Sequence, residues 1–153
     1  KPPDYAARIV RHLASLEPGA RVTAGEIARK RLIPPALIRR IVSRLSSAGI
    51  LKTARGSGGG IALARPARKV SLREVVEAME GEVALNGCVV KPGDCPLSDL
   101  CPVQRAWCRA SRRLASALGR IRFSDLAASM TPKASAGKPP AGRGRRGEEE
   151  SMS

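Results

Sequence analysis

The sequence predicts a mainly α-helical fold that contains one small β-hairpin. Helical apolar spacing or helix caps mark six segments, whereas only two short runs, on either side of a glycine cluster, are strand candidates. Hydrophobic residues make up 42% of the 153 residues and aromatic residues only 2%, so the core is built mostly from Leu, Ile, Val and Ala. No apolar run approaches the roughly 18 residues of a membrane span. We expect a cytoplasmic protein of one domain, or of one domain with an appendage.

The first helix is expected over residues 4–16. Asp4 stands where an N-cap residue would stand, and "EPG" ends the segment. His12 has Arg8 and Arg11 as neighbours, and we expect it at the surface. The buried stripe of this helix comprises Ala6, Ile9, Val10, Leu13 and Leu16.

Two further helices follow, separated by a tight break at "LIP". Residues 22–31 open with Thr23 and place Glu26 three residues later, which is a capping-box signature. Residues 35–49 begin with a proline suited to a first helical position and end at a glycine. A short helix, a break and a second, arginine-rich helix predict a helix-turn-helix. The expected buried stripe of the second helix is Leu37, Ile41, Val42 and Leu45, with Arg39, Arg40 and Arg44 facing outward.

A glycine cluster lies between the two strand candidates. The segment "ILKTARGSGGGIALARP" (50–66) contains five consecutive residues, 56–60, of which four are glycine. Arg55 stands directly before this run. We interpret the segment as a β-hairpin wing whose glycines allow the backbone close to a phosphate chain. A nucleotide-binding phosphate loop is the competing interpretation, but the Gly-Lys-Ser/Thr ending and the following helix are both missing.

The second half contains two more helical patterns and a short final one. Residues 71–81 form a helix capped by Ser71 and Glu74, residues 102–121 form the longest helix, and residues 122–129 form the last. The apolar stripe of the longest helix suits either dimerisation or packing in the core, and comprises Val103, Ala106, Trp107, Ala110, Leu114, Ala117, Leu118 and Ile121. Residues 131–153 are rich in Pro, Gly, Ser and charge, and we expect a disordered basic and acidic tail.

The positive charge is concentrated in the first half. Residues 1–70 carry 15 Lys and Arg against 3 Asp and Glu, whereas residues 71–130 carry 8 against 7. This asymmetry favours a nucleic-acid-binding half joined to a more neutral half. We expect four regions: a winged helix-turn-helix domain (1–81), a cysteine loop (82–101), a dimerisation helix with a short terminal helix (102–130) and the tail (131–153).

All four cysteines of the chain lie within "CVVKPGDCPLSDLCPVQRAWC", residues 88–108. Their spacing is Cys-x6-Cys-x5-Cys-x6-Cys, without the Cys-x2–4-Cys pairs of zinc fingers or the x2 gaps of ferredoxins. By spacing alone, an iron–sulfur site in an open loop is one option among several. Stable disulfides are disfavoured in a cytosolic protein.

The order of elements and motifs resembles the Rrf family of bacterial winged helix-turn-helix regulators, the IscR/NsrR-like iron–sulfur transcription factors. The resemblance covers roughly residues 4–130 and rests on "DYAARIV", "GEIARKRLIPPALIRRIVSRLSSAGIL", "RGSGGGIALARP", "SLREVVEAMEG" and the three cysteines before a Pro-x-x-x-x-Trp helix start. It implies a homodimer that binds palindromic double-stranded DNA operators.

The resemblance assigns roles to particular residues of the DNA-binding half. Ala36, Arg39 and Arg40 would face base edges in the major groove, where a bidentate arginine–guanine contact gives about 1–3 kcal/mol of discrimination. Arg44 and Lys52 would reach phosphates. In the wing, Arg55 would enter the minor groove, with the wing shaped by Gly58, Gly59 and Gly60.

The resemblance also implies that Cys88, Cys95 and Cys101 hold an iron–sulfur cluster. The six residues between Cys88 and Cys95 are one more than is usual in the family. IscR-like members use a histidine three residues after the third cysteine, where this chain has Gln104, a poor ligand. NsrR-like members take a carboxylate from the partner's first helix, and Asp4 matches that position. We therefore favour 4Fe–4S over 2Fe–2S and place Cys108 behind Asp4 as the fourth ligand.

These observations lead to a dimeric transcriptional regulator, expected to be a repressor, whose cluster senses nitric oxide, redox state or iron supply. The alternative is a cluster-free winged-helix regulator that depends on thiol oxidation or zinc. An architectural DNA binder would not need the cysteines. We expect no enzymatic activity and no small-molecule substrate, because the sequence has no acid/base pair, no nucleophile with a partner histidine and no nucleotide loop.

Overall fold

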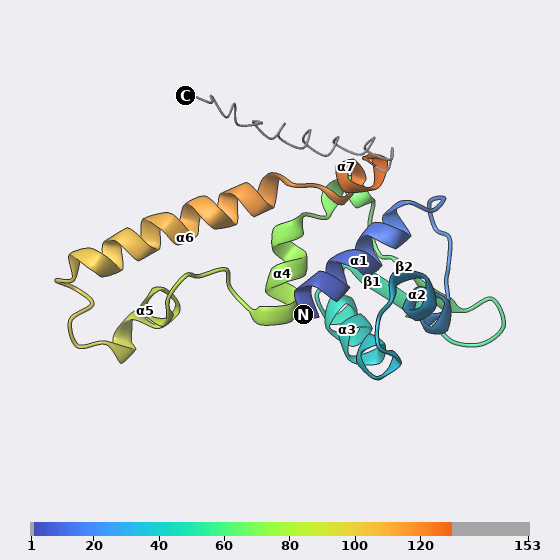
Figure 1. The fold of residues 1–153 in the computed structure, drawn as a ribbon, viewed down its shortest axis with the longest axis horizontal. Helices are drawn as coiled ribbons and strands as arrows, with labels where there is room; N and C mark the ends of the chain where they lie inside the picture. The colour runs from blue at the N-terminus through green and yellow to red at the C-terminus, as the bar shows by residue number, and fades with distance from the viewer. Residues whose placement is uncertain (1, 130–153) are drawn as a thin grey trace, which may run out of the picture.

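The computed structural model describes residues 2–129, a helical body from which one long helix projects (Figure 1). Its helices and strands follow the predicted order, with three additional short helical turns, one after the hairpin and two in the cysteine loop. They are α1 (Pro2–Ala14), α2 (Ala24–Arg31), α3 (Pro35–Ser47), β1 (Leu51–Ala54), β2 (Gly60–Leu63), η1 (Ala67–Lys69), α4 (Leu72–Glu80), α5 (Gly87–Val90), η2 (Pro92–Asp94), α6 (Pro102–Arg120) and α7 (Phe123–Ala128).

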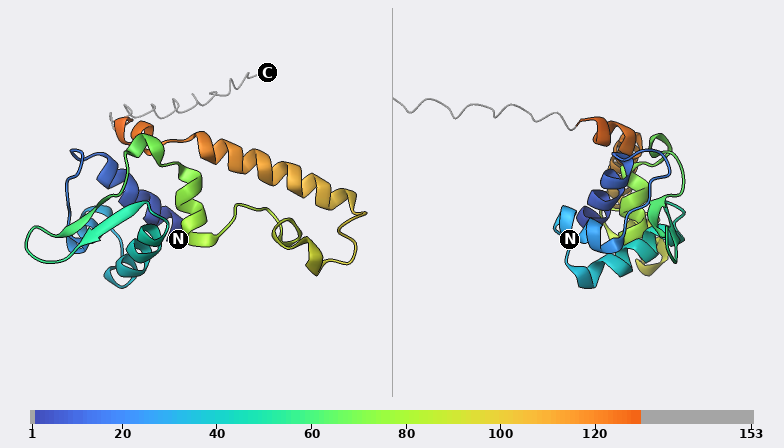
Figure 2. Two further views of the ribbon diagram at one scale, coloured as in Figure 1. Left: turned by 180° about the vertical axis from the view of Figure 1, so that it is seen from behind. Right: turned by 90° about the vertical axis from the view of Figure 1, so that its right-hand side faces the viewer.

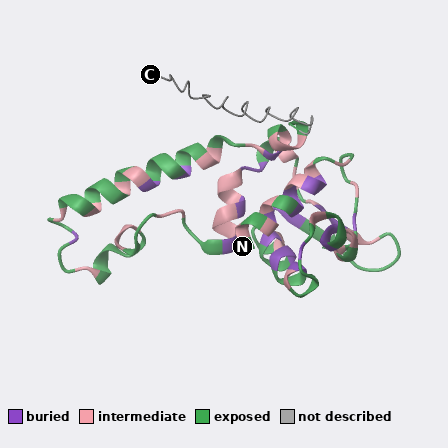
Figure 3. Cartoon of the chain, viewed as in Figure 1, coloured by how far each residue is buried: buried purple, intermediate pink, exposed green. Residues whose placement is uncertain are grey.

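The core lies where α1, α2, α3 and α4 meet the hairpin. Figure 3 shows the buried residues concentrated in this body. Four residues of the expected stripe of α1 are buried, and Leu16 is half-buried against them. On α3 the buried position is Ile38 rather than Leu37, which is half-buried, so that part of the stripe was placed one residue too early. Completely buried aliphatic side chains include Ile9, Val10, Ile27, Leu45 and Ile50.

Both predicted capping boxes are present. The Thr23 hydroxyl accepts a hydrogen bond from the Glu26 N–H at 3.2 Å, and the Thr23 N–H donates to the Glu26 carboxylate at 3.0 Å. Ser71 and Glu74 form the same reciprocal pair at the start of α4. Each box satisfies helix N–H groups that would otherwise lack a partner, which fixes where α2 and α4 begin.

The hairpin is antiparallel, with Leu51 opposite Leu63 and Ala54 opposite Gly60. A third segment joins it, because Val22 and Ile61 exchange backbone hydrogen bonds of 3.0 and 2.8 Å. The wing is therefore attached to the residues that precede α2, a pairing across 39 positions that the local pattern does not reveal.

The base of α6 is fixed to the body through backbone contacts. The Leu72 N–H donates to the Ile121 carbonyl at 2.9 Å, and the Phe123 N–H donates to the Val70 carbonyl at 3.0 Å. The completely buried Phe123 ring belongs to the core of the body. These contacts hold one end of α6 while the other end carries the cysteine loop.

The rest of α6 and the short α5 form an arm beside the body, as the front and rear views show (Figures 1 and 2). Much of the predicted apolar stripe of α6 is exposed: Val103 by 58%, Trp107 by 37% and Leu114 by 38%. The side of α6 that is buried carries Ser111 and Ala115 instead. We call Val103, Trp107, Leu114 and Ile121 the apolar strip of α6; Ile121 is 37% exposed.

Two features of the sequence prediction concern the chain ends. Helix α1 begins at Pro2, so Asp4 lies inside its first turn and the prediction that Asp4 is the N-cap was wrong. The predicted tail, 131–153, lies outside the described residues. Among the residues that are described, no helix combines the length and apolarity required to cross a bilayer.

Candidate DNA-binding surface and cysteine loop

Helix α3 presents one polar face to solvent. Ala36, Arg39 and Arg40, the predicted base-contacting residues, are all exposed on it. Helical spacing adds Ser43 to the same face, and this residue is also exposed. Ser43 was not among the predicted residues, although its position four residues after Arg39 was a sufficient signal. The exposed face can therefore offer guanidinium and hydroxyl donors to a groove of DNA.

Arg44 has a partner inside the protein. Its guanidinium donates a hydrogen bond to the main-chain carbonyl of Met79, near the end of α4. Carbonyl groups in the last turn of a helix lack helical partners, so the arginine satisfies one of them and holds α3 against α4. Its contact with phosphate stays a prediction.

The wing begins with the exposed Arg55 and turns on glycines. Gly58 has a backbone φ of +78°, which L-residues with a side chain rarely adopt. A Cβ on Gly59 would lie 2.5 Å from the Ala54 carbonyl oxygen, so no larger residue fits without moving the backbone. Gly60 sits beside Arg21, whose Cβ would be 3.3 Å from an added methyl group.

Arg21 is a second candidate that sequence reasoning missed. It is exposed, and the pairing of Val22 with Ile61 brings it beside the wing. No local motif contains that information, because the pairing joins segments that are distant in the chain. Arg21 and Arg55 together make the wing region cationic.

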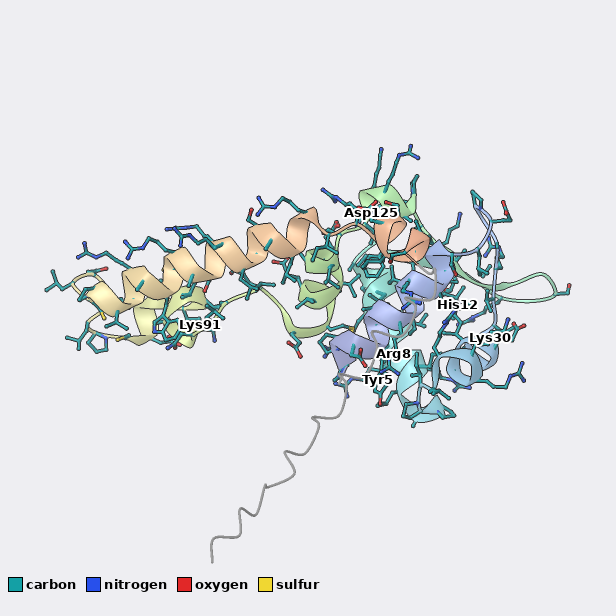
Figure 4. All side chains as sticks on the ribbon, turned by 45° about the horizontal axis from the view of Figure 1, so that its top comes forward. Tyr5, Arg8, His12, Lys30, Lys91 and Asp125 are labelled. Carbon is teal, nitrogen blue, oxygen red and sulfur yellow. The ribbon has the colours of Figure 1, made fainter. Side chains whose placement is uncertain are left out.

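His12 is buried, with 5% of its surface exposed, so the expectation of a surface histidine was wrong. Its Nδ1 lies 2.7 Å from Nη2 of Arg31 at the end of α2. Because arginine can only donate, Nδ1 accepts this bond and the imidazole is neutral. Burial, followed by the charges of Arg31 and Lys30, lowers the pKa of His12, while Glu26 opposes this shift. Figure 4 labels His12 on α1 and Lys30 on α2.

The cysteine loop closes against the start of α6. Cys101 is the N-cap residue of α6, and its sulfur accepts a hydrogen bond of 3.4 Å from the Gln104 N–H. The Gln104 side-chain amide in turn donates to the Cys88 carbonyl at 3.4 Å. Gln104 thus connects the first and third cysteines through hydrogen bonds. The Cys101 sulfur therefore satisfies one of the N–H groups that lack a helical partner at the start of α6.

The four cysteines are half-buried and all are free thiols. Cys88 lies on α5, Cys95 follows η2, and Cys108 lies two turns along α6 from Cys101. Within residues 2–129, no group of three or more His, Cys, Asp or Glu side chains converges in a way that could hold a metal ion. The donor types fit an iron–sulfur cluster, and binding one requires the loop to draw its thiols together.

Asp4 lies on α1, in the body, and its carboxylate is ion-paired with Arg8 at 2.9 Å. The same guanidinium lies over the Tyr5 ring, 5.6 Å from its centre, and Figure 4 labels both residues on α1. The Asp4 side chain is 55% exposed, so a second molecule can reach it. The ion pair holds the Asp4 carboxylate beside Arg8, one helical turn away on the same face of α1.

Comparisons with known proteins agree with this architecture. The Rrf2 family profile, described as an iron-dependent transcriptional regulator, matches residues 2–129. The HTH-type transcriptional repressor NsrR of Streptomyces coelicolor is 32% identical over 131 residues, which is 84% of this chain and 86% of that protein. The HTH-type transcriptional regulator IscR of Xenorhabdus nematophila is 31% identical over 105 residues, and the match spans 69% of this chain and 63% of IscR.

Solved structures share the fold at lower identity. CymR (YrzC), the global cysteine regulator of B. subtilis, superposes with a TM-score of 0.69 at 22% identity and covers 84% of this chain and 94% of CymR. T. potens IscR gives a TM-score of 0.65 at 19% identity and covers 82% of each chain. These likenesses confirm the winged-helix fold predicted from the sequence.

Proposed function

The chain belongs to the Rrf2 family of transcriptional regulators, and on that premise we propose that it is a homodimeric, operator-specific DNA-binding repressor controlled by an iron–sulfur cluster. The family is one of regulators and not of enzymes. The observation that carries the DNA-binding part is the exposed face of α3, followed by the glycine wing. Within residues 2–129, the Arg39 and Arg40 side chains form no ion pair. The protein acts in the cytoplasm, where its DNA target lies.

In the proposed complex, α3 enters the major groove. Ala36, Arg39 and Arg40 face base edges, and each good bidentate arginine–guanine contact is worth about 1–3 kcal/mol of discrimination. Lys52 on β1 is exposed and contacts phosphate, which positions the protein without reading sequence. Arg55 reaches into the adjacent minor groove, where narrow A·T-rich segments attract arginine.

The apolar strip of α6 supports the homodimer. Exposed Val103, Trp107 and Leu114 form a continuous apolar face on a helix that projects from the body, and such a face is stabilised when a second copy covers it. A C₂ dimer places two α3 helices on one side, which matches the two half-sites of a palindromic operator.

Cys88, Cys95 and Cys101 are the proposed cluster ligands, with Asp4 of the second copy as the fourth and 4Fe–4S as the favoured type. Such a cluster supplies redox chemistry and reactivity toward nitric oxide or oxygen. The chain itself supplies the Cys101 sulfur at the N-cap of α6 and the exposed carboxylate of Asp4. Cys108 stays second to Asp4, because it lies about 10 Å along α6 from Cys101.

This ligand set links the cysteine loop of one copy to α1 of the other. Asp4 and α3 belong to the same body, so holding α1 sets the distance between the two α3 helices. If nitric oxide, oxidants or iron shortage broke this link between the cysteine loop and Asp4, the constraint would be lost. Operator affinity would then change by the difference in stability between the two arrangements.

A cluster-free thiol or zinc switch is the second candidate, and one observation favours it. The four thiols are free, half-buried and not assembled into a metal site in the described chain. A solved structure of the same fold is the oxidised form of Staphylococcus aureus CymR, with 22% identity and a TM-score of 0.64. In this case dithiothreitol or a chelator alone would change DNA affinity.

The test uses protein purified without oxygen, with visible spectroscopy, iron and sulfide analysis, and DNA binding to an operator selected in vitro from random sequence. The proposal expects a brown protein with about four irons per chain, and cluster-dependent operator affinity. A colourless protein after anaerobic reconstitution, with affinity that responds to dithiothreitol, would establish the second candidate. R39Q/R40Q should lose operator selection while keeping its helical content.

A further inference from the structure

Helix α6 carries a second cationic surface, separate from α3. Five arginines and Ser116 occupy one side of this helix at spacings of three and four residues, which is one helical face. We call these arginines the arginine ridge: Arg105, Arg109, Arg112, Arg113 and Arg120. Figure 4 shows a row of nitrogen-tipped side chains along α6, on the side away from α5 and Lys91.

The ridge has no counter-charge within the described chain. All five arginines are exposed, and none of their guanidinium groups forms an ion pair or hydrogen bond with another described residue. The sequence of α6, PVQRAWCRASRRLASALGR, contains no Asp or Glu. Elsewhere in the described chain an exposed arginine does pair, as Arg8 does with Asp4 at 2.9 Å. Five unpaired like charges on about 22 Å of helix repel one another and attract a polyanion.

The ridge also lacks any apolar component. The apolar strip of α6 lies on a different face of the helix, and the buried face carries Ser111 and Ala115. An open depression on the ridge is lined by Arg109, Arg112, Arg113, Ser116 and Arg120 alone. Protein partners normally bury an apolar patch at the centre of their contact, whereas a nucleic-acid backbone is bound by arginine and hydroxyl donors without one.

We propose that the arginine ridge binds the phosphate backbone of a second DNA segment, one that is not read by α3. The protein then holds two duplexes at once, or two segments of one looped duplex, with α3 on the operator and the ridge on neighbouring DNA. The inference goes beyond the proposed function and uses it for the first contact only. Guanidinium groups suit this role because they form paired hydrogen bonds with phosphate oxygens.

The first experiment measures binding of a mixed-sequence duplex as a function of salt, with the full chain carrying R39Q/R40Q so that α3 no longer contributes. We expect residual, salt-sensitive binding. Adding R109Q/R112Q should weaken it about tenfold or more and reduce the slope of log affinity against log salt by about 1.8, since each lost phosphate contact accounts for about 0.9. The R109K/R112K variant, which retains the charge, should restore most of the affinity.

The matched control is R68Q/K69Q, which removes the same charge from two exposed residues of η1. This control should keep the affinity for the mixed-sequence duplex within about twofold of the parent, and the slope of log affinity against log salt should stay unchanged. Glutamine is a good helix former, so R109Q/R112Q should keep its circular dichroism and size-exclusion profile. Equal weakening by the two variants would show that only net charge matters and would overturn the proposal.

The second experiment uses the otherwise unsubstituted protein, an operator duplex with a donor dye and a mixed-sequence duplex with an acceptor dye. Energy transfer between them should appear on adding protein and disappear in R109Q/R112Q, while operator affinity stays the same. Absence of transfer in the parent protein overturns the proposal. Binding of polyglutamate without binding of any duplex would also overturn the proposal. That outcome would make an acidic protein the partner of the arginine ridge. The mixed-sequence assay needs no operator, so it can fail while the proposed function holds.

Discussion

The hydroxyl of Ser111 is the contact that we expect to hold the cysteine loop against α6. Ser111 is only 2% exposed, and its Oγ accepts a hydrogen bond of 3.0 Å from the Leu85 N–H, three residues before Cys88. Ser111→Ala removes the acceptor and little volume. Leu85 is 47% exposed, so its N–H can be rehydrated once the loop opens.

The expected cost is therefore that of one ordinary hydrogen bond, about 0.5–1.5 kcal/mol, rather than that of a buried unsatisfied group. Because about 1.4 kcal/mol corresponds to a factor of ten, the loop should open about two- to twelvefold more often. Thiol modification that requires opening should accelerate by the same factor. The helical body, which has its own core and capping boxes, should keep its urea midpoint.

The assay is alkylation of each cysteine, followed by mass spectrometry of the metal-free protein. Cys88 and Cys95 should react faster in Ser111→Ala, whereas Cys108, which lies on α6 itself, serves as the internal reference and should change little. Ser116→Ala, an exposed position on the same helix, is the control. If Cys108 accelerates as much as Cys88 and the urea midpoint falls, Ser111 supports the whole helix and the reasoning is refuted.

Three further outcomes are expected. Gly59→Ala should weaken DNA binding with little change in the urea midpoint, because its methyl group would clash with the Ala54 carbonyl and displace only the wing; unchanged DNA affinity would show that the wing is not used. The folded state lowers the pKa of His12 below its ordinary value of 6.5, so the unfolded state binds more protons and stability should fall as pH drops below about 6.5. His12→Gln should reduce this loss of stability, which is measured as the difference between the urea midpoints at about pH 7.5 and about pH 5.5. An identical pH dependence in the variant and the parent would exclude His12 as the source of the loss. Phe123→Ala should destabilise the body by about 3–5 kcal/mol in urea unfolding, because its ring is completely buried; a loss below about 1 kcal/mol would mean that the base of α6 is held by the backbone contacts alone.

Local sequence information was sufficient wherever the cause of a structure lies within a few residues. The Thr23–Glu26 and Ser71–Glu74 boxes placed the starts of two helices, since cap and partner are three positions apart. The glycine run predicted the hairpin because its backbone conformations exclude most other residues. Apolar spacing predicted the buried stripe of α1, because one helical face repeats every three or four residues.

Contacts between distant segments decided the rest. No residue near His12 in the sequence predicts its contact with Arg31. Only the packing of α1 on α2 buries the imidazole and brings its Nδ1 to 2.7 Å from Nη2 of Arg31. The pairing of Val22 with Ile61 moves Arg21 beside the wing, and the bond from Arg44 to Met79 gives an apparently free arginine a partner. Each of these depends on the relative placement of elements, which residue spacing within one element does not encode.

The sequence by itself determined the order of helices, the wing, the arginines of α3 and the clustering of the four cysteines, because helix periodicity, caps and glycine conformations act over a few residues. The tertiary structure alone decided which side of α6 is buried. The stripe spacing was compatible with core or dimer packing, whereas in the structure Ser111 faces the cysteine loop and accepts the Leu85 N–H. This orientation leaves the apolar strip and the arginine ridge on separate exposed faces, since α6 buries only the side that meets α4 and the cysteine loop.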